Sequence, residues 1–303
     1  MHIADEHVDH WRRHGYVIAP LLSPDEVEAA RRNALRYFPD ADEWSRGRQR
    51  YTTMPVQHEF PFVDDALNDV ATHPDLISFM ERALGTTDLM VTQSLVWAKY
   101  PGYGDGEQQL HIDYYNNSLA YPSDEEPFGQ VPSILYLEDM TETIGPTWAV
   151  SREHTRQRTL VPPALTRDEH PEIYAHEFPV LAKAGEIFLY DMRTYHRGSA
   201  FTATDGWRLT FHNVYRKAGC EWMGWRAFPQ QGLDPAMSRF LQRATVRQRT
   251  VIGFPAPGHA YWNEQTLAGV AARYPEMDMA AYREAMSQRP QNGRAPEITP
   301  AAR

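Results

Sequence analysis

The spacing of apolar residues has a helical period near the N-terminus. Ser23-Pro24-Asp25-Glu26 has the form of a helix-capping box with proline at the first helical position. The apolar residues that follow recur at helical spacing, which predicts a helix over residues 24–38. A second helix is predicted to begin at Pro74 and to stop at Gly85, with one apolar face made of Leu76, Phe79, Met80 and Ala83.

After Gly85 the period changes from helical to alternating, which is typical of half-buried strands. The predicted strands are residues 89–100, 109–114, 131–138, 147–150, 186–191 and 207–216. Turns rich in Pro, Gly and acidic residues separate them, and this arrangement predicts a β-sandwich or barrel rather than alternating βα units. Helical patterns return at about residues 235–245 and 263–287.

No internal repeat and no linker divides the chain, so we expect a single domain over residues 1–287. Its β core is expected at about residues 89–217, preceded by the N-terminal helices and followed by a C-terminal helical segment. The tail at residues 288–303 is rich in Pro, Ala and Arg, and we predict that it is disordered.

Composition narrows the class of protein. The chain of 303 residues is 42% hydrophobic and 23% charged, an ordinary globular balance. No apolar run is long enough for a membrane helix, and the acidic N-terminus does not resemble a signal peptide. With one cysteine, Cys220, the chain has no disulfide framework and no multi-cysteine metal site. We therefore expect a cytoplasmic protein that does not act at a membrane.

Charge and aromatic content bear on the partner. Lys and Arg number 30 against 40 Asp and Glu, a net charge of −10, and no basic block is present. This balance argues against a nucleic-acid partner. Aromatic residues make up 12% of the chain, which suits a pocket for a small organic molecule as well as it suits a core. The sequence leaves the oligomeric state open.

Candidate metal ligands appear as a His-x-Asp pair. On a strand, such a pair places both side chains on one face, with Cα atoms about 7 Å apart. His7-Val8-Asp9 lies at the N-terminus and His73-Pro74-Asp75 opens a helix, so only His111-Ile112-Asp113 lies in an alternating strand. A facial metal triad needs a third ligand, normally a histidine from another strand.

His196 is the best-placed third ligand, because it follows the predicted strand 186–191 and precedes small residues. Its main rivals are His154 and His212. We expect His154 to be a structural hydrogen-bonding residue and His212 to be a satisfied interior histidine.

Arg208 follows His196 by twelve residues, and strand parity places Thr210 on the same face as Arg208. An arginine beside a hydroxyl is a good receptor for a carboxylate. The order and spacing of His111, Asp113, His196 and Arg208 resemble the iron(II)/2-oxoglutarate dioxygenases and, more specifically, the phytanoyl-CoA dioxygenase-like branch.

The resemblance extends over residues 11–217. Ile144–His154 is similar to the family segment N-G-P-L-W-V-V-P-G-S-H, with Ile144 in place of Asn and Arg152-Glu153 in place of Gly-Ser. The other similar stretches are Trp11–Ile18, Leu22–Val27, Gln109–Asp113 and Ala184–Asp191 with His196-Arg197-Gly198.

This resemblance implies a mainly β fold with flanking helices, a cupin-like jelly roll or double-stranded β-helix. It also implies that Fe(II) is held by His111, Asp113 and His196, with 2-oxoglutarate as co-substrate and O₂ as oxidant. The residues predicted to bind 2-oxoglutarate are Arg208, Thr210 and Gln93. The residues predicted to contact the substrate are Lys99, Tyr114, Tyr115, Asn117 and Trp148.

The predicted activity is oxidation, and specifically hydroxylation, of an unactivated C–H bond in a small organic molecule, with release of succinate and CO₂. Secondary metabolism is the expected setting. Desaturation, ring closure and demethylation use the same machinery, and the sequence does not separate them because they depend on how the substrate is placed.

Two alternatives remain at this stage. A jelly-roll metalloenzyme that does not use 2-oxoglutarate, such as a cupin-like isomerase or hydrolase, would not need Arg208. A non-catalytic jelly roll that binds a small molecule would not need an open triad. A halogenase of the same fold is disfavoured, because those related enzymes carry a small residue in place of Asp113.

Overall fold

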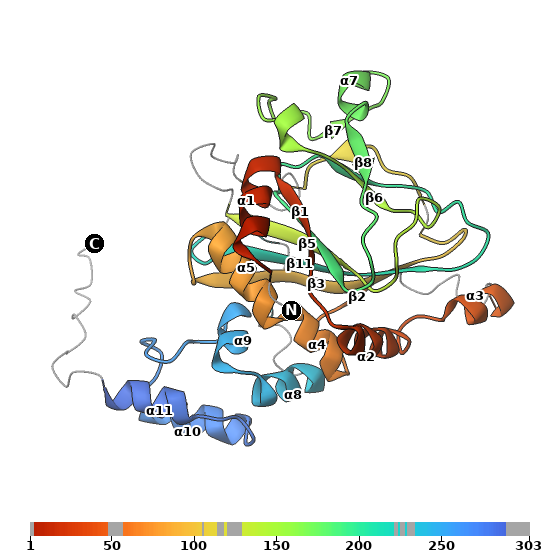
Figure 1. Cartoon of the computed structure of the whole chain (residues 1–303). Coiled ribbons are helices and arrows are strands. Elements are labelled where there is room, and N and C mark those ends of the chain that lie inside the picture. Colours follow the sequence, from red (N-terminus) through yellow and green to blue (C-terminus); the bar gives the residue numbers. More distant parts are fainter. Residues whose placement is uncertain are drawn as a thin grey trace, which may run out of the picture.

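Two antiparallel sheets form the centre of the molecule in the computed structural model (Figure 1). The structure describes residues 3–47, 57–104, 106–113, 118–119, 129–220, 224, 228 and 234–288. The larger sheet has the order β1 (Tyr16–Pro20), β9 (Glu186–Tyr190), β5 (Gln130–Tyr136), β11 (Arg208–Lys217), β3 (Leu89–Lys99) and β2 (Gln57–Glu59). The smaller sheet has the order β7 (Ala164–Leu165), β4 (Leu110–His111), β10 (His196–Gly198), β6 (Thr147–Val150) and β8 (Glu177–Pro179).

Helices pack against the larger sheet. α1 (Asp5–His14) contacts β1, and α5 (Pro74–Leu84) contacts β5 and β11. The remaining helical segments are α2 (Pro24–Ala34), α3 (Ala41–Gly47), α4 (Asp65–Ala71), η2 (Arg152–His154), α7 (Pro171–Tyr174), α8 (Pro235–Arg243), α9 (Val246–Val251), α10 (Glu264–Arg273) and α11 (Ala280–Ser287). Figure 1 shows α7, β7 and β8 at one end of the molecule and α8 to α11 at the other. A mainly β fold with flanking helices is therefore confirmed.

Strand alternation divides the larger sheet between two environments. The residues of β3 and β11 that face the helices belong to the main hydrophobic core and include Val96, Ala98, Leu209 and Phe211. Most residues at the intervening positions line a cavity between the sheets, among them Leu95, Trp97, Lys99, Arg208 and His212. Because side chains alternate along a strand, one face stabilises the fold while the other is available for chemistry.

The predicted helices are found with shifted ends. Ser23 Oγ accepts from the Glu26 amide at 3.4 Å, while the Glu26 carboxylate accepts from the Ser23 amide at 2.7 Å, so the capping box is confirmed. The helix after it ends at Ala34 rather than at residue 38, and a turn follows. The second predicted helix ends at Gly85 in the left-handed conformation, as predicted.

The predicted strand over residues 109–114 is wrong in extent. β4 covers only Leu110–His111, and Asp113 lies in a turn beyond it. The ladder with β7 cannot continue because the next residue opposite is Pro163, which accepts from the Ile112 amide at 3.0 Å but has no N–H to return. The predicted helical segment 263–287 is likewise two helices, α10 and α11, with Pro275 between them.

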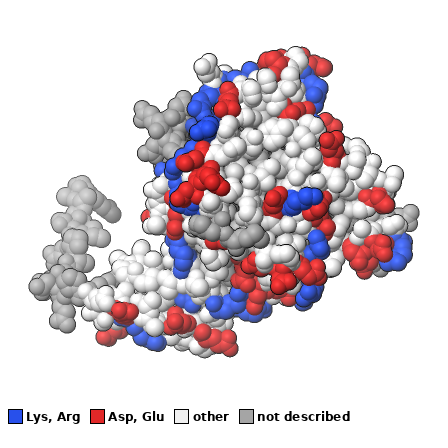
Figure 2. Space-filling model, viewed as in Figure 1, with Lys and Arg blue, Asp and Glu red and all other residues white. Residues whose placement is uncertain are grey.

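The face of the molecule in Figure 2 shows no single dominant charge. On the face in Figure 2, acidic and basic side chains are interspersed, and a broad area carries neither. Within the described ranges, no helix is both long and apolar enough to cross a membrane. Of the predicted disordered tail, Gln288 caps the end of α11, and residues 289–303 lie outside the described residues.

Candidate active site

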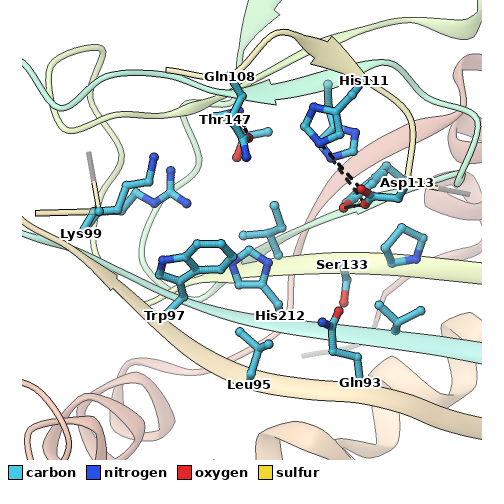
Figure 3. A pocket seen from close by; sticks show the side chains of 18 of the residues that line it. Gln93, Leu95, Trp97, Lys99, Gln108, His111, Asp113, Ser133, Thr147 and His212 are labelled. Carbon is cyan, nitrogen blue, oxygen red and sulfur yellow. Dashed lines mark hydrogen bonds and ion pairs between the residues drawn. The ribbon is translucent and has the colours of Figure 1, made fainter. Parts of the chain in front are cut away.

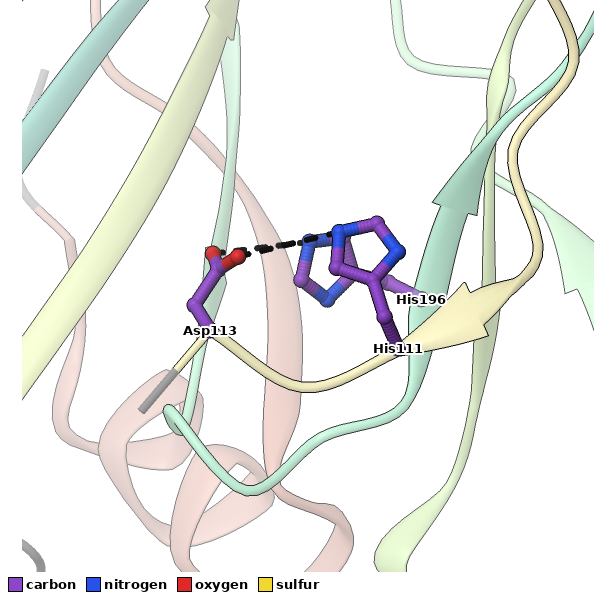
Figure 4. Close-up of side chains that lie close together, drawn as sticks. All are labelled: His111, Asp113 and His196. Atoms are coloured by element: carbon purple, nitrogen blue, oxygen red, sulfur yellow. Dashed lines mark ion pairs between the residues drawn. The ribbon is translucent and has the colours of Figure 1, made fainter. Parts of the chain in front are cut away.

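The smaller sheet and the turn after β4 bring the three predicted metal ligands together (Figure 4). His111 on β4 and His196 on β10 are directly paired across the sheet, with ring centroids 4.6 Å apart. Asp113 faces both rings: its Oδ1 lies 3.7 Å from His111 Nε2 and its Oδ2 lies 3.5 Å from His196 Nε2. Candidate ligand atoms of the three residues all lie within 4.8 Å of one another.

Backbone carbonyls set which imidazole nitrogen is available. His111 Nδ1 lies 2.9 Å from the Gln109 carbonyl, and His196 Nδ1 lies 3.0 Å from the Thr194 carbonyl. A carbonyl can only accept, so each Nδ1 carries a proton, and Nε2, on the side of Asp113, is the ring atom available to a metal. Burial lowers the pKa of His196, opposed by the charge of Asp113 and assisted by His111, and this favours the neutral form that binds metals.

Tyr190, at the end of β9, supports the carboxylate of the triad. Its hydroxyl donates to Asp113 Oδ2 at 2.9 Å, and its ring lies 4.6 Å from the His196 ring. Burial, and after it the negative charge of Asp113, raise the pKa of Tyr190, so the hydroxyl stays protonated as a donor. No prediction from the sequence gave Tyr190 a role, because Asp113 is distant from it along the chain.

A cavity of about 350 Å³ extends from the triad between the two sheets (Figure 3). His111 and Asp113 lie on one side of it, and Lys99 lies on the opposite side. Trp97 and His212 lie between these two sides, and the other lining residues include Gln93, Leu95, Gln108, Pro132, Ser133, Ile134, Thr147, Tyr190, His196, Arg208 and Val214.

Arg208 is a buried cation at this cavity. It is 4% exposed, and its guanidinium donates through Nη1 to the Gly145 carbonyl. Its Nε has no hydrogen-bond partner among the described residues. Burial lowers the pKa of Arg208, and the neighbouring Tyr136 opposes this shift. A buried guanidinium with an unsatisfied donor is suited to an anionic ligand.

Of the other residues predicted to contact co-substrate or substrate, some line the cavity and some do not. Gln93 and Lys99 line the cavity, and Lys99 Nζ donates to the Ser199 carbonyl at 3.3 Å. Thr210 does not line it: its hydroxyl lies 3.0 Å from His212 Nε2 and 3.4 Å from the Trp97 carbonyl. The structure thus places the Thr210 hydroxyl against His212, and the predicted contact of Thr210 with 2-oxoglutarate stays a prediction.

Trp148, a predicted substrate contact, lies on the other face of its strand in this structure, and its contact with substrate stays a prediction. It pairs with Arg197, whose guanidinium carbon lies 5.3 Å from the centroid of its ring, and neither residue lines the cavity. Its neighbour Thr147 lines the cavity instead, because adjacent residues on a strand face opposite sides. The remaining predicted substrate residues, Tyr114, Tyr115 and Asn117, lie outside the described residues.

His154 and His212, the alternatives to His196 as third ligand, lie in different places. His154 lies outside the cavity, where its ring stacks on His176 with centroids 3.8 Å apart. His212 is bonded through Nε2 as expected of an interior histidine, yet it also lines the cavity. The sequence could have predicted this place, because His212 follows Arg208 by four residues and Thr210 by two, and such residues share one face of a strand.

The structure therefore combines a jelly roll, a candidate metal triad and a buried arginine that lines the same cavity. The family model for phytanoyl-CoA dioxygenase (PhyH) matches residues 11–210, and the chain belongs to this family. It is an Fe(II)- and 2-oxoglutarate-dependent dioxygenase that uses O₂. Both alternatives, an enzyme without 2-oxoglutarate and a non-catalytic binding protein, are thereby removed. No protein of curated function matches the sequence.

Solved structures share the fold. The 2-oxoglutarate-dependent carbocyclase SnoK from nogalamycin biosynthesis is 22% identical, with a TM-score of 0.52 over 71% of this chain and 85% of SnoK. HygX from Streptomyces hygroscopicus, crystallised with nickel, 2-oxoglutarate and hygromycin B, is 16% identical, with a TM-score of 0.53 over 74% of this chain and 91% of HygX. AviO1 from Streptomyces viridochromogenes is 20% identical, with a TM-score of 0.50 over 71% and 96% of the two chains.

Proposed function

We propose that this enzyme hydroxylates an unactivated C–H bond of a small organic molecule in secondary metabolism. His111, Asp113 and His196 would hold the iron, and Arg208 would bind the distal carboxylate of 2-oxoglutarate. The observation that carries the proposal is that the triad and the buried Arg208 line one cavity of about 350 Å³. Two neutral imidazoles and one carboxylate, with no thiolate, form a donor set that suits Fe(II) and leaves positions open.

The chain's own residues orient the reactants. Bound iron supplies O₂-dependent decarboxylation of 2-oxoglutarate to succinate and CO₂, coupled to oxidation of the substrate. Arg208 holds one end of the co-substrate, because its planar fork fits a carboxylate. Part of the cavity lining is apolar, and Gln93 and Ser133 offer hydrogen bonds that would select the substrate pose.

The substrate class rests on the cavity and on the relatives. The cavity combines apolar side chains such as Leu95, Ile134 and Val214 with the amide of Gln93, which suits an oxygen-bearing organic molecule. Gln93 and Lys99 are the residues we propose as its contacts or as further contacts of the oxoacid. SnoK belongs to nogalamycin biosynthesis and HygX was crystallised with hygromycin B, which supports a natural-product substrate.

The metal assignment is tested by anaerobic titration with iron(II) and then 2-oxoglutarate. We expect one iron per chain in the parent enzyme and loss of tight binding in His111→Ala and His196→Ala. His154→Ala is the matched control, since His154 lies outside the cavity, and it should bind iron as the parent does. Unchanged iron affinity in both triad variants would overturn the assignment.

The reaction outcome is tested by a substrate screen read out as succinate formation, followed by mass spectrometry of products made under ¹⁸O₂ in chloride buffer. Asp113 occupies the position that a halide would need, so we expect a product with one labelled oxygen and no chlorine. A ring-closed or desaturated product without the label would show that the enzyme catalyses ring closure or desaturation and not hydroxylation. A chlorinated product would contradict the role of Asp113.

A further inference from the structure

A second cavity, of about 300 Å³, lies where the loop after η2 meets the turn before β10. It shares no lining residue with the active-site cavity. Among the described residues its lining contains no carboxylate, but it contains four arginines: Arg152, Arg156, Arg158 and Arg193. Arg152 is one of the departures from the family segment N-G-P-L-W-V-V-P-G-S-H, in which glycine stands at this position.

The carboxylates that contact these arginines lie outside the lining. Asp191 accepts from Arg193 Nη2 at 2.8 Å and from Arg152 Nη1 at 3.3 Å. Glu172 lies 3.7 Å from Arg158 Nη1. Arg156 donates to a neutral acceptor, the carbonyl of Arg13, at 2.8 Å. The lining therefore carries four arginines, of which two share Asp191 and a third lies near Glu172.

Two buried polar atoms at this cavity have no hydrogen-bond partner among the described residues: Thr155 Oγ1 and Arg158 Nε. Thr155 is only 4% exposed. Buried polar atoms in native proteins are nearly always hydrogen-bonded, so each unsatisfied one calls for a partner. Arg158 Nε can only donate, and the Thr155 hydroxyl can donate as well as accept, so a ligand with acceptor atoms could partner both.

We propose that this cavity is a second binding site, for a phosphate group. An oxyanion offers several acceptor atoms and negative charge at once, and guanidinium groups match its geometry. The cavity has room for about ten waters at roughly 30 Å³ each, so it can hold either free phosphate or a phosphate ester with part of its organic group.

A bound phosphate would also stabilise the turn at residues 193–194, which contacts the candidate metal ligand His196. Arg193 is followed by Thr194, whose carbonyl accepts from His196 Nδ1 at 3.0 Å and whose hydroxyl donates to the Gly15 carbonyl at 2.7 Å. Phosphate is therefore expected to raise the melting temperature, by about 2–4 °C at ten times its Kd.

The test is calorimetric titration of inorganic phosphate into the full-length enzyme loaded anaerobically with iron(II) and 2-oxoglutarate, at constant ionic strength. We expect saturable binding that Arg158→Gln weakens roughly ten- to a hundredfold, the effect of losing one charge-assisted hydrogen bond. The nearly isosteric Thr155→Val should weaken it severalfold without disturbing the fold. Arg32→Gln is the matched control, since Arg32 is an exposed arginine on α2, and it should bind as the parent does.

Two results would overturn the proposal. One is parental phosphate affinity in both Arg158→Gln and Thr155→Val. The other is competition between phosphate and 2-oxoglutarate, which would place the phosphate in the active-site cavity. Titration with ribose 5-phosphate then distinguishes the source: tighter binding than inorganic phosphate supports a phosphate ester as ligand, and weaker binding supports free phosphate.

Discussion

Tyr190 is the residue that orients the triad's only carboxylate without being one of the three proposed ligands. It donates to Asp113 Oδ2 at 2.9 Å, which holds one oxygen and directs the other toward His111. Loss of such an outer contact typically lowers metal affinity about 10–100-fold, and we expect this range for Tyr190→Phe. Iron(II) titration measures it.

The matched control for Tyr190 is Tyr215→Phe. Tyr215 is also a fully buried tyrosine, but its hydroxyl donates to the Ala71 carbonyl at 2.7 Å, away from the cavity. It should reduce stability without changing iron affinity. Equal iron affinities in Tyr190→Phe and the parent would show that Asp113 is held by other contacts.

Arg208 is expected to govern the affinity for the co-substrate. A charge-assisted hydrogen bond contributes about 1.5–3 kcal/mol, so Arg208→Ala should raise the KM for 2-oxoglutarate roughly ten- to a hundredfold. Arg208→Lys should recover only part of this, because the ammonium cannot reproduce the planar fork. Arg167→Ala, at an arginine bound to Glu177 outside the cavity, should leave this KM unchanged.

His212 makes stability depend on pH. Burial, and after it the charge of Arg208, lower the pKa of His212 to about 3 from its ordinary value of 6.5. In the window between these values only the unfolded chain takes up the proton. The stabilising contribution is therefore complete above pH 6.5 and is lost as the pH falls.

This dependence can be measured by urea unfolding of the metal-free protein at pH 7 and pH 5. Each pH unit below 6.5 corresponds to about 1.4 kcal/mol, so the parent should lose about 2 kcal/mol more than His212→Gln over this interval. Glutamine keeps a polar group near Thr210 but does not titrate. Identical losses in the two proteins would mean that His212 is protonated in the folded state.

At the scale of elements, the turn before β9 packs closely against the segment that follows β1. This contact fixes how β1 and β9 meet. Gly185 has a φ of 90°, and a Cβ placed there would lie 2.7 Å from the Leu22 carbonyl oxygen. That carbonyl lies on the segment between β1 and α2, whose Leu21 and Leu22 amides both donate to the Gly185 carbonyl. The turn thus joins α2 to the strand that carries Tyr190.

Gly185→Ala should therefore destabilise the protein more than a change in backbone preference alone explains. Gly206 has a φ of 88°, and a Cβ placed there would have nothing within 4 Å, so Gly206→Ala isolates the cost of the left-handed backbone, about 1–2 kcal/mol. We expect Gly185→Ala to cost a further 1–3 kcal/mol or so in urea unfolding, from the steric overlap. Equal losses would show that the turn relaxes freely.

At the scale of the whole molecule, one hydrophobic core joins the two ends of the described chain. Ile3 and Trp11 from the N-terminus and Tyr282 from α11 belong to the same buried cluster as the larger sheet. Arg249 ties the C-terminal helices together, since its Nε donates to the Leu241 carbonyl at 2.8 Å and its Nη1 lies 3.3 Å from the Tyr282 hydroxyl. These contacts support our proposal of a single domain over residues 1–287.

Because the largest buried cluster joins both ends of the described chain, the protein should unfold in a single step. We expect thermal unfolding followed by tryptophan fluorescence and by circular dichroism to give coincident transitions, with calorimetric and van't Hoff enthalpies in agreement. An earlier, separate transition of the C-terminal helices would divide the chain into two units and contradict the single-domain proposal.

The sequence alone determined the features that depend on local order along the chain. The capping box at Ser23, the helix stop at Gly85 and the alternation of the long strands are local, because hydrogen bonds and side-chain periodicity act over a few residues. The predicted triad and arginine could likewise be proposed from spacing, since a family's ligands keep their order along its strands.

The tertiary structure decided which face of each strand meets the cavity. Alternation shows that Thr147 and Trp148 point in opposite directions, but only the pairing of Trp148 with Arg197 shows which of them faces away. For the same reason the contact between Tyr190 and Asp113, residues far apart in sequence, could not be foreseen. Asp113 itself reaches the histidines from a turn, because the strand ends where Pro163 offers no N–H.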